Sequence, residues 1–291
     1  MLKGFINRTL PITRIKLGIA NIIYSVLHIF YGNKPRLITR KGVRFEIDLS
    51  EAIDLSLFLF GNYQSHVNKS KLLQLPKDAV MIDIGANIGA MCLQFAKAAP
   101  SGKIYAFEPA HATLVRLKRN LELNPELAAN IEVIHSFVSA KSVEKDADIK
   151  AYSSWKVDGK TTGEKHPRHG GLQLSTEGVG SISIDDFCKS AKLARLDFIK
   201  IDTDGHENEI FMGAKETIVK FRPQIIFEIG IYVMEENNVD FSFYSNYFKE
   251  FNYCMYDSDN GHIITMDNYK NYIPKNGTID IIANPLPLNG K

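Results

Sequence analysis

The sequence predicts an α/β protein built on a mostly parallel sheet. Five short apolar runs, which begin near residues 80, 103, 131, 196 and 223, have the length and boundaries of buried strands. Helical patterns separate several of these runs, and strands that alternate with helices form βαβ units. The composition is that of an ordinary globular chain, because 45% of the 291 residues are hydrophobic and 23% are charged.

Residues 1–35 are predicted to form a basic amphipathic extension ahead of a domain over residues 36–291. Residues 1–45 contain nine Lys or Arg and no Asp or Glu, whereas the remainder contains 26 basic and 33 acidic residues. The apolar run at 15–31 is shorter than the roughly 20 residues of a spanning helix. Small or polar residues recur in it at steps of three or four, which favours an amphipathic helix.

This helix has three alternative roles. It packs on its own domain, or residues 1–33 contact an anionic membrane surface, or it is a targeting segment. Three scattered cysteines cannot form a paired framework and indicate a reducing compartment. We therefore expect a cytoplasmic protein, with peripheral contact to the membrane as one of the alternatives.

Further elements follow in order. Residues 36–49 alternate like a hairpin around Lys41-Gly42. Helices are predicted at 90–99, 112–123 and 207–221, and two final strands within 253–266 and 278–285. The glycine-rich stretch 153–180 interrupts the alternation, and a loop of this length is a lid beside the active cleft or a surface loop.

A glycine turn follows the first strand of the predicted sheet. The strand contains Asp83 and leads into GANIG at residues 85–89, where Gly85 permits a tight turn and Gly89 a close approach of ligand or helix. The spacing is neither the G-x-G-x-x-G of dinucleotide enzymes nor a P-loop. A carboxylate at Asp83 would repel a pyrophosphate but would suit an ammonium or sulfonium group.

A second acid ends the next strand. Glu108 follows Asp83 by 25 residues, where an acid can accept hydrogen bonds from both ribose hydroxyls of a nucleoside. The turn and the two acids together indicate an adenosine-containing ligand without a pyrophosphate. S-adenosylmethionine is the obvious candidate.

With these features the chain resembles the FkbM-type methyltransferases. The matching pieces, in the family's order over residues 36–285, include RKGVRFEIDL, DIGANIG, YAFEP, SIDDF, IKIDTDGHENEIFMGA, RPQIIFEI and DIIANP. The resemblance implies a class I methyltransferase (Rossmann-like) sheet of seven strands with a reversed final strand. It also implies an S-adenosylmethionine-dependent enzyme that methylates a hydroxyl of a sugar, a glycan or a secondary metabolite.

The resemblance assigns cofactor-binding roles to matching positions. These are Asp83, Gly85, Asn87 and Gly89 in the cofactor loop, Glu108 at the ribose, and Ser136 and Phe137 at the adenine edge. The family often has Gly-x-Tyr-Glu before the cofactor loop, and this chain has Gln64 in place of that glutamate. Glutamine keeps the hydrogen bonds of the acid and loses its charge.

The segment after the fourth strand carries the groups that remove a proton from a hydroxyl. We predict His206 as the catalytic base, Asp202 as the runner-up, and Glu228 as a group that orients the ring or binds substrate hydroxyls. Hard oxygens here would suit magnesium, but no metal is expected, since class I O-methyl transfer often needs none. The acidic body argues against a nucleic-acid partner.

Two other classes of function remain open. One is an NAD(P)-dependent oxidoreductase, which the absent G-x-G-x-x-G and the acid at Asp83 disfavour. The other is a non-catalytic binding module that retains the fold, for which Gln64 is the hint.

Overall fold

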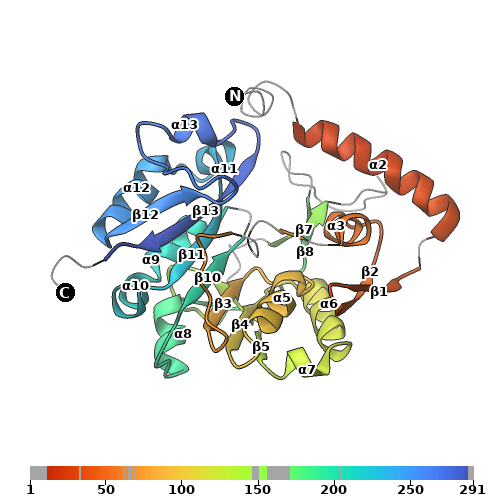
Figure 1. Ribbon diagram of the computed structural model, residues 1–291, viewed down its shortest axis with the longest axis horizontal. Coiled ribbons are helices and arrows are strands. Elements are labelled where there is room, and N and C mark those ends of the chain that lie inside the picture. The colour runs from red at the N-terminus through yellow and green to blue at the C-terminus, as the bar shows by residue number, and fades with distance from the viewer. Residues whose placement is uncertain are drawn as a thin grey trace.

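The computed structural model describes residues 12–32, 34–61, 63–64, 67, 70–145, 151–155, 171–203 and 205–287. Seven strands form the central sheet in the order β12-β13-β11-β10-β3-β4-β5 (Figure 1). Their bounds are β3 Val80–Ile84, β4 Lys103–Phe107, β5 Ile131–Ile134, β10 Phe198–Ile201, β11 Gln224–Gly230, β12 Tyr253–Asp257 and β13 Thr278–Pro285. Neighbouring strands are parallel except at β13, which runs antiparallel to both β11 and β12. The predicted seven-stranded sheet with a reversed final strand is confirmed.

Helices cover both faces of the sheet, which explains why its strands read as continuous apolar runs. The helices that follow β3 are α5 Ala90–Ala98, α6 His111–Glu122, α7 Pro125–Ala128, α8 Ile184–Ser190, α9 Glu207–Met212, α10 Lys215–Phe221, α11 Ile231–Glu236, α12 Phe241–Glu250 and α13 Tyr269–Tyr272. Met81 and Phe198 pack in the core that contains side chains of α5 and α6, whereas Ile82 and Ile199 pack in the opposite core. Because side chains alternate along a strand, Asp83 and Lys200 also belong to the α5 face.

The predicted hairpin at 36–49 is confirmed. Strands β1 (Arg36–Arg40) and β2 (Val43–Ile47) pair antiparallel on either side of the turn. Lys41 and Gly42 have φ of 49° and 77°, the two positive values that a tight two-residue hairpin turn requires. Helix α3 (Ala52–Phe60) follows and packs with β2 in a third core cluster.

The apolar run of the extension is helical, as predicted. Helix α2 (Ile12–Tyr31) packs on the hairpin and α3 through Tyr24, which is buried, and through Ile23 and Leu27, which are partly buried. In the part of the chain that the structure describes, no helix has the length and apolar character needed to cross a membrane.

The prediction of a single helix over residues 207–221 is wrong. The segment forms two helices, α9 and α10, which are separated at Gly213 and Ala214. A Cβ on Gly213 would lie 2.5 Å from the carbonyl oxygen of Ser139, and the Gly213 carbonyl accepts a hydrogen bond from the Asp185 N–H. This break depends on a tertiary contact, which helical periodicity does not reveal.

The stretch at 153–180 overlaps an antiparallel hairpin of β7 (Ala151–Trp155) and β8 (Gly171–Leu174). Residues 156–170, the middle of the proposed lid, lie outside the described residues. After β8 the chain returns to the loop that follows β5, where β6 (Phe137–Val138) pairs with β9 (Ser181–Ile182). The end of the stretch at residue 180 therefore lies beside the loop that follows β5, where the Phe137 N–H donates to the Gly180 carbonyl.

Candidate active site

A cleft lies at the carboxyl ends of the central strands, the edge where open α/β sheets bind ligands. It contains about 580 Å³ of space, part of it open to solvent. Its lining residues come from the ends of β3, β4, β5 and β10 and from β7: Ile84, Gly85, Asn87, Phe107, Glu108, Pro109, Ser136, Phe137, Val138, Ala151, Tyr152, Asp202, Thr203 and His206.

The glycine turn forms one wall of this cleft. Gly85 has φ 76°, and a Cβ there would lie 2.0 Å from the carbonyl oxygen of Asp202, so the end of β10 leaves no room for a side chain. Asn87 also has a positive φ, and its side-chain oxygen accepts a hydrogen bond from the N–H of Ile88. Gly89 is not among the lining residues. A Cβ there would lie 2.6 Å from the Leu117 side chain, so its role is to admit helix α6.

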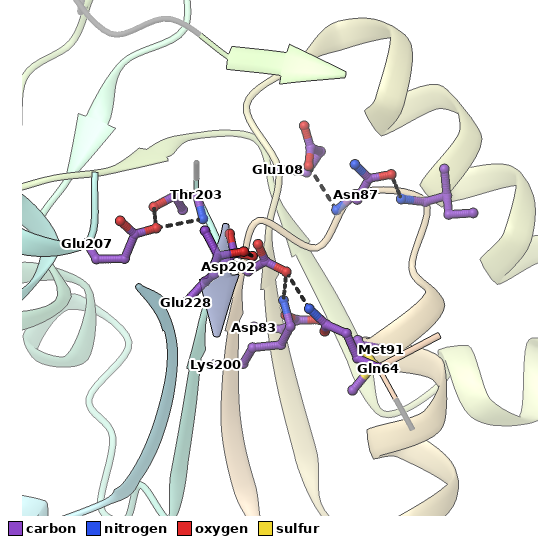
Figure 2. A network of polar contacts seen from close by, with 12 residues as sticks. Gln64, Asp83, Asn87, Met91, Glu108, Lys200, Asp202, Thr203, Glu207 and Glu228 are labelled. Atoms are coloured by element: carbon purple, nitrogen blue, oxygen red, sulfur yellow. Dashed lines mark hydrogen bonds and ion pairs between the residues drawn. The ribbon is translucent and has the colours of Figure 1, made fainter. Parts of the chain in front are cut away.

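Glu108 connects the two halves of the predicted cofactor site. Its carboxylate accepts hydrogen bonds from the backbone N–H groups of Asn87 and Ala110, both at 2.9 Å. Figure 2 shows the hydrogen bond from Asn87. Burial raises the pKa of Glu108 to about 7, and these two donors oppose the rise only in part. The residue predicted to bind ribose is thus fixed in position and titrates near neutral pH.

A buried cluster of charges lies beside the glycine turn. The Lys200 amino group is 3.1 Å from Asp202 Oδ2 and 3.6 Å from Asp83 Oδ1, and Gln64 Nε2 donates to Asp202 Oδ2 at 2.8 Å. Figure 2 shows Lys200 and Gln64 converging on Asp202. The structure thus brings together Asp83, Asp202 and Gln64, three residues that lie far apart in the sequence, around a lysine that sequence reasoning missed.

Three acceptor atoms of this cluster lack hydrogen-bond partners. Both carboxylate oxygens of Asp83 and the side-chain oxygen of Gln64 are buried without a donor. Burial raises the pKa of Asp83, opposed by the nearby Lys200 charge. Unsatisfied buried acceptors are costly, and a ligand ammonium, which offers three donors, would satisfy them. The acceptors on these two residues therefore suit the amino-acid end of S-adenosylmethionine, although neither Asp83 nor Gln64 is among the residues that line the cleft.

The loop after β10 is held by Glu207. Its Oε1 accepts hydrogen bonds from the Thr203 N–H and hydroxyl and from the Gly205 N–H, at 3.1–3.3 Å. Burial raises the pKa of this carboxyl group. His206 precedes α9, is half-buried and lines the cleft. Asp204 lies outside the described residues.

Glu228 is less directly placed than predicted. It lies in β11, is not among the residues that line the cleft, and accepts a hydrogen bond of 2.5 Å from the Thr278 hydroxyl of β13. Its position favours a supporting role beside the strand pair over direct contact with the acceptor.

The predicted adenine edge, Ser136 and Phe137, also lines the cleft. The Ser136 hydroxyl donates to the carbonyl oxygens of Phe137 and Gly180, and the Phe137 ring is buried. Tyr152 of β7 adds an aromatic side chain that sequence reasoning did not single out. Its only signal was its place at the border of the unusual stretch at 153–180.

No group of three or more His, Cys, Asp or Glu among the described side chains could hold a metal ion. The pairing of Asp202 with Lys200 and Gln64 further occupies one oxygen that a cation would use.

The chain is similar to known methyltransferases. It is 27% identical over 157 residues to the 2-O-methyltransferase NoeI of Sinorhizobium fredii, a match that covers 52% of this chain and 63% of the relative. It is 28% identical over 146 residues to the hexuronic acid methyltransferase AglP of Haloferax volcanii, covering 49% of this chain and 52% of the relative. The matched segments thus span about half to three fifths of these relatives.

Among solved structures, an FkbM methyltransferase from Methylobacillus flagellatus is similar, with 17% identity and a TM-score of 0.48. That match covers 74% of this chain and 46% of the other. The model of the methyltransferase FkbM domain matches residues 83–255, from the first acid of the glycine turn to β12. This match covers more than half of the chain, which therefore belongs to the FkbM methyltransferase family.

Proposed function

We propose that the chain transfers a methyl group from S-adenosylmethionine to a hydroxyl of a sugar, a glycan or a secondary metabolite. The observation that carries the cofactor is the group of unpartnered acceptors on Asp83 and Gln64, beside the backbone-anchored carboxylate of Glu108. The names of the two relatives, a 2-O-methyltransferase and a hexuronic acid methyltransferase, support a carbohydrate hydroxyl as the acceptor.

When bound, S-adenosylmethionine would supply a methyl group on a positively charged sulfur. An acceptor oxygen in line with the carbon–sulfur bond would bond to the methyl carbon as that bond breaks, and the sulfur would leave as a neutral thioether. The chain's own residues hold the two reactants. Asp83 and Gln64 would accept hydrogen bonds from the ammonium, Glu108 would accept from the ribose hydroxyls, and Ser136 and Phe137 would border the adenine. Much of the rate then comes from positioning.

The acceptor's proton must leave as the new bond forms. His206 lines the cleft, and histidine is the side chain that most often acts as a general base in enzymes. Asp202 also lines the cleft, but its Oδ2 already accepts hydrogen bonds from Lys200 and Gln64. This arrangement suits Asp202 for orienting a substrate hydroxyl and leaves His206 as the base.

Calorimetry of the full chain with S-adenosylmethionine and with NAD tests the cofactor. We expect binding of the first alone, weakened about 10- to 150-fold by Glu108→Gln or Asp83→Asn, because each change removes charge-assisted hydrogen bonds. Glu132→Gln, which alters an exposed carboxylate on β5, is the matched control and should change nothing. Binding of NAD in place of S-adenosylmethionine would refute the proposal.

The acceptor is tested with methyl-tritiated S-adenosylmethionine and a panel of uronic acids, neutral sugars and aglycone alcohols. We expect label on an oxygen of at least one carbohydrate. Cofactor binding without transfer to any hydroxyl compound would leave the non-catalytic module as the better description.

A further inference from the structure

Helix α2 has two apolar faces, and its contact with the domain covers one of them. The packed face contains the buried Tyr24. The other face consists of Ile22, Val26, Ile29 and Phe30, whose exposed fractions are 66, 51, 79 and 77%. We call these four residues the outer face of α2. Their spacing places them in a single stripe along the helix, and Figure 1 shows α2 at the periphery of the molecule.

Packing on the domain therefore does not account for this helix. Single exposed apolar side chains are ordinary, but a continuous stripe of four large ones marks an interaction surface. More apolar surface follows where α2 ends. The centres of the Tyr31 ring and the Phe58 ring of α3 lie 5.7 Å apart, and Phe60 is 69% exposed.

The charged residues of the chain up to residue 45 have one sign. Residues 1–45 contain nine Lys or Arg and no acidic residue. Lys34, Lys41 and Arg44 are exposed, and the Arg36 guanidinium lies 4.6 Å from the centre of the Tyr31 ring. A partner for the outer face must accept apolar side chains and offer negative charge beside them.

We propose that α2 docks on an anionic lipid surface, with its outer face inserted at the boundary between head groups and acyl chains. Such a boundary accepts an apolar stripe on a convex helix without requiring a matching groove, and anionic head groups complement the flanking cations. The exposed Asn21 and Ser25 lie beside the stripe, where they remain at head-group depth. The helix lies along the surface, because its opposite face stays packed against the hairpin and α3.

Co-sedimentation of the full chain with vesicles tests the proposal. We expect binding to mixed phosphatidylcholine and phosphatidylglycerol vesicles at low salt, and much weaker binding to phosphatidylcholine alone. Phe30→Ser should weaken partitioning about tenfold, since it removes a large inserted side chain. Lys34→Gln together with Lys41→Gln should weaken binding to the anionic vesicles by about fivefold for each charge removed, and should make that binding less dependent on salt.

Matched changes elsewhere give the controls. Val219→Ser removes a side chain of α10 that is 63% exposed, and Lys215→Gln removes an exposed charge of the same helix. Both should leave vesicle binding unchanged, and thermal unfolding of every variant should match that of the parent, because all the altered side chains are exposed.

Light scattering without vesicles tests whether the outer face of α2 binds a second copy of the chain and not a lipid surface. If Phe30→Ser converts a dimer to a monomer and leaves vesicle binding intact, the outer face is a protein interface and the proposal is wrong. It is equally wrong if the full chain ignores anionic vesicles at low salt, or if Val219→Ser weakens binding as much as Phe30→Ser.

Discussion

Lys200 and Asp83 are register partners on the neighbouring strands β10 and β3, and their charged atoms lie 3.6 Å apart. Their side chains are 4% and 0% exposed, so the pair is shielded from water. Lys200 also contacts Asp202, so one cation serves two acids. Burial alone would lower the pKa of Lys200, but the carboxylates of Asp202 and Asp83 outweigh it and raise that pKa. The lysine thus links the acid assigned to the cofactor with the acid assigned to the acceptor.

Removing this cation should destabilise the fold. Lys200→Met leaves buried carboxylates without their counter-charge, so we expect a loss of about 3–5 kcal/mol in the free energy of unfolding, measured with urea. Lys103→Met breaks the exposed Lys103–Glu132 pair and should cost less than about 1 kcal/mol. Adding Asp83→Asn to Lys200→Met should recover part of the loss. Equal costs for the two lysines would contradict a structural role for the buried pair.

Cofactor affinity should depend on the ionisation of Glu108. The pKa of Glu108 in the free protein is about 7, whereas ribose hydroxyls donate to its ionised form. Binding therefore releases a proton below that pH, and affinity should fall up to tenfold for each unit of pH below about 7 and level off above it. Calorimetry across this range measures the effect, and Glu108→Gln should give weaker binding with a flat profile.

The same group acts on stability with the opposite sign. Its pKa in the folded state is raised above its usual value of 4.5, so folding favours the protonated form. Its contribution to the stability of the free protein is present in full below about pH 4.5 and is lost as the pH rises through about 7. A saturating ligand that keeps Glu108 ionised should abolish this trend between about pH 4.5 and 7, which thermal unfolding with and without S-adenosylmethionine would show.

Two glycines with the same φ separate backbone strain from close packing. Gly85 and Gly178 both have φ 76°, but a Cβ on Gly178 has nothing within 4 Å, whereas on Gly85 it meets the Asp202 carbonyl. Gly178→Ala should cost about 1–2 kcal/mol of stability from the φ angle alone. Gly85→Ala should cost more and should also abolish cofactor binding, since β3 and β10 must separate. Similar losses in both variants would show that the contact with Asp202 is unimportant.

His206→Ala should lower turnover at least about 100-fold and leave cofactor affinity nearly unchanged, because a base acts on the acceptor and not on the cofactor. His262→Ala alters an exposed histidine that is not among the cleft-lining residues and serves as the control. If His206→Ala retains turnover while Asp202→Asn loses it, the base is the aspartate.

Much of this site could be predicted because its signals are local. The strand, glycine turn and helix at 80–98 are adjacent in sequence, and Glu108 ends the next strand. Lys200 was missed although it stands within the buried strand FIKI, where a cation requires a carboxylate partner. Asking which acid neutralises it would have pointed to Asp202, two residues later on the same face. The pairing of Lys200 with Asp83 depends on the register between β10 and β3, and the helix break at Gly213 depends on tertiary packing. A single sequence reveals neither.

The place of β13 in the sheet has a consequence for the order of folding during synthesis. Among the described strands, β12 joins the sheet only through β13, which is synthesised after β12 and lies between β12 and β11. In a nascent chain that has emerged only as far as β12, one edge of β11 is unpaired and β12 has no neighbouring strand to pair with. This half of the molecule therefore closes after residues 278–285 leave the ribosome, and until then the exposed edge of β11 is the point most open to mispairing.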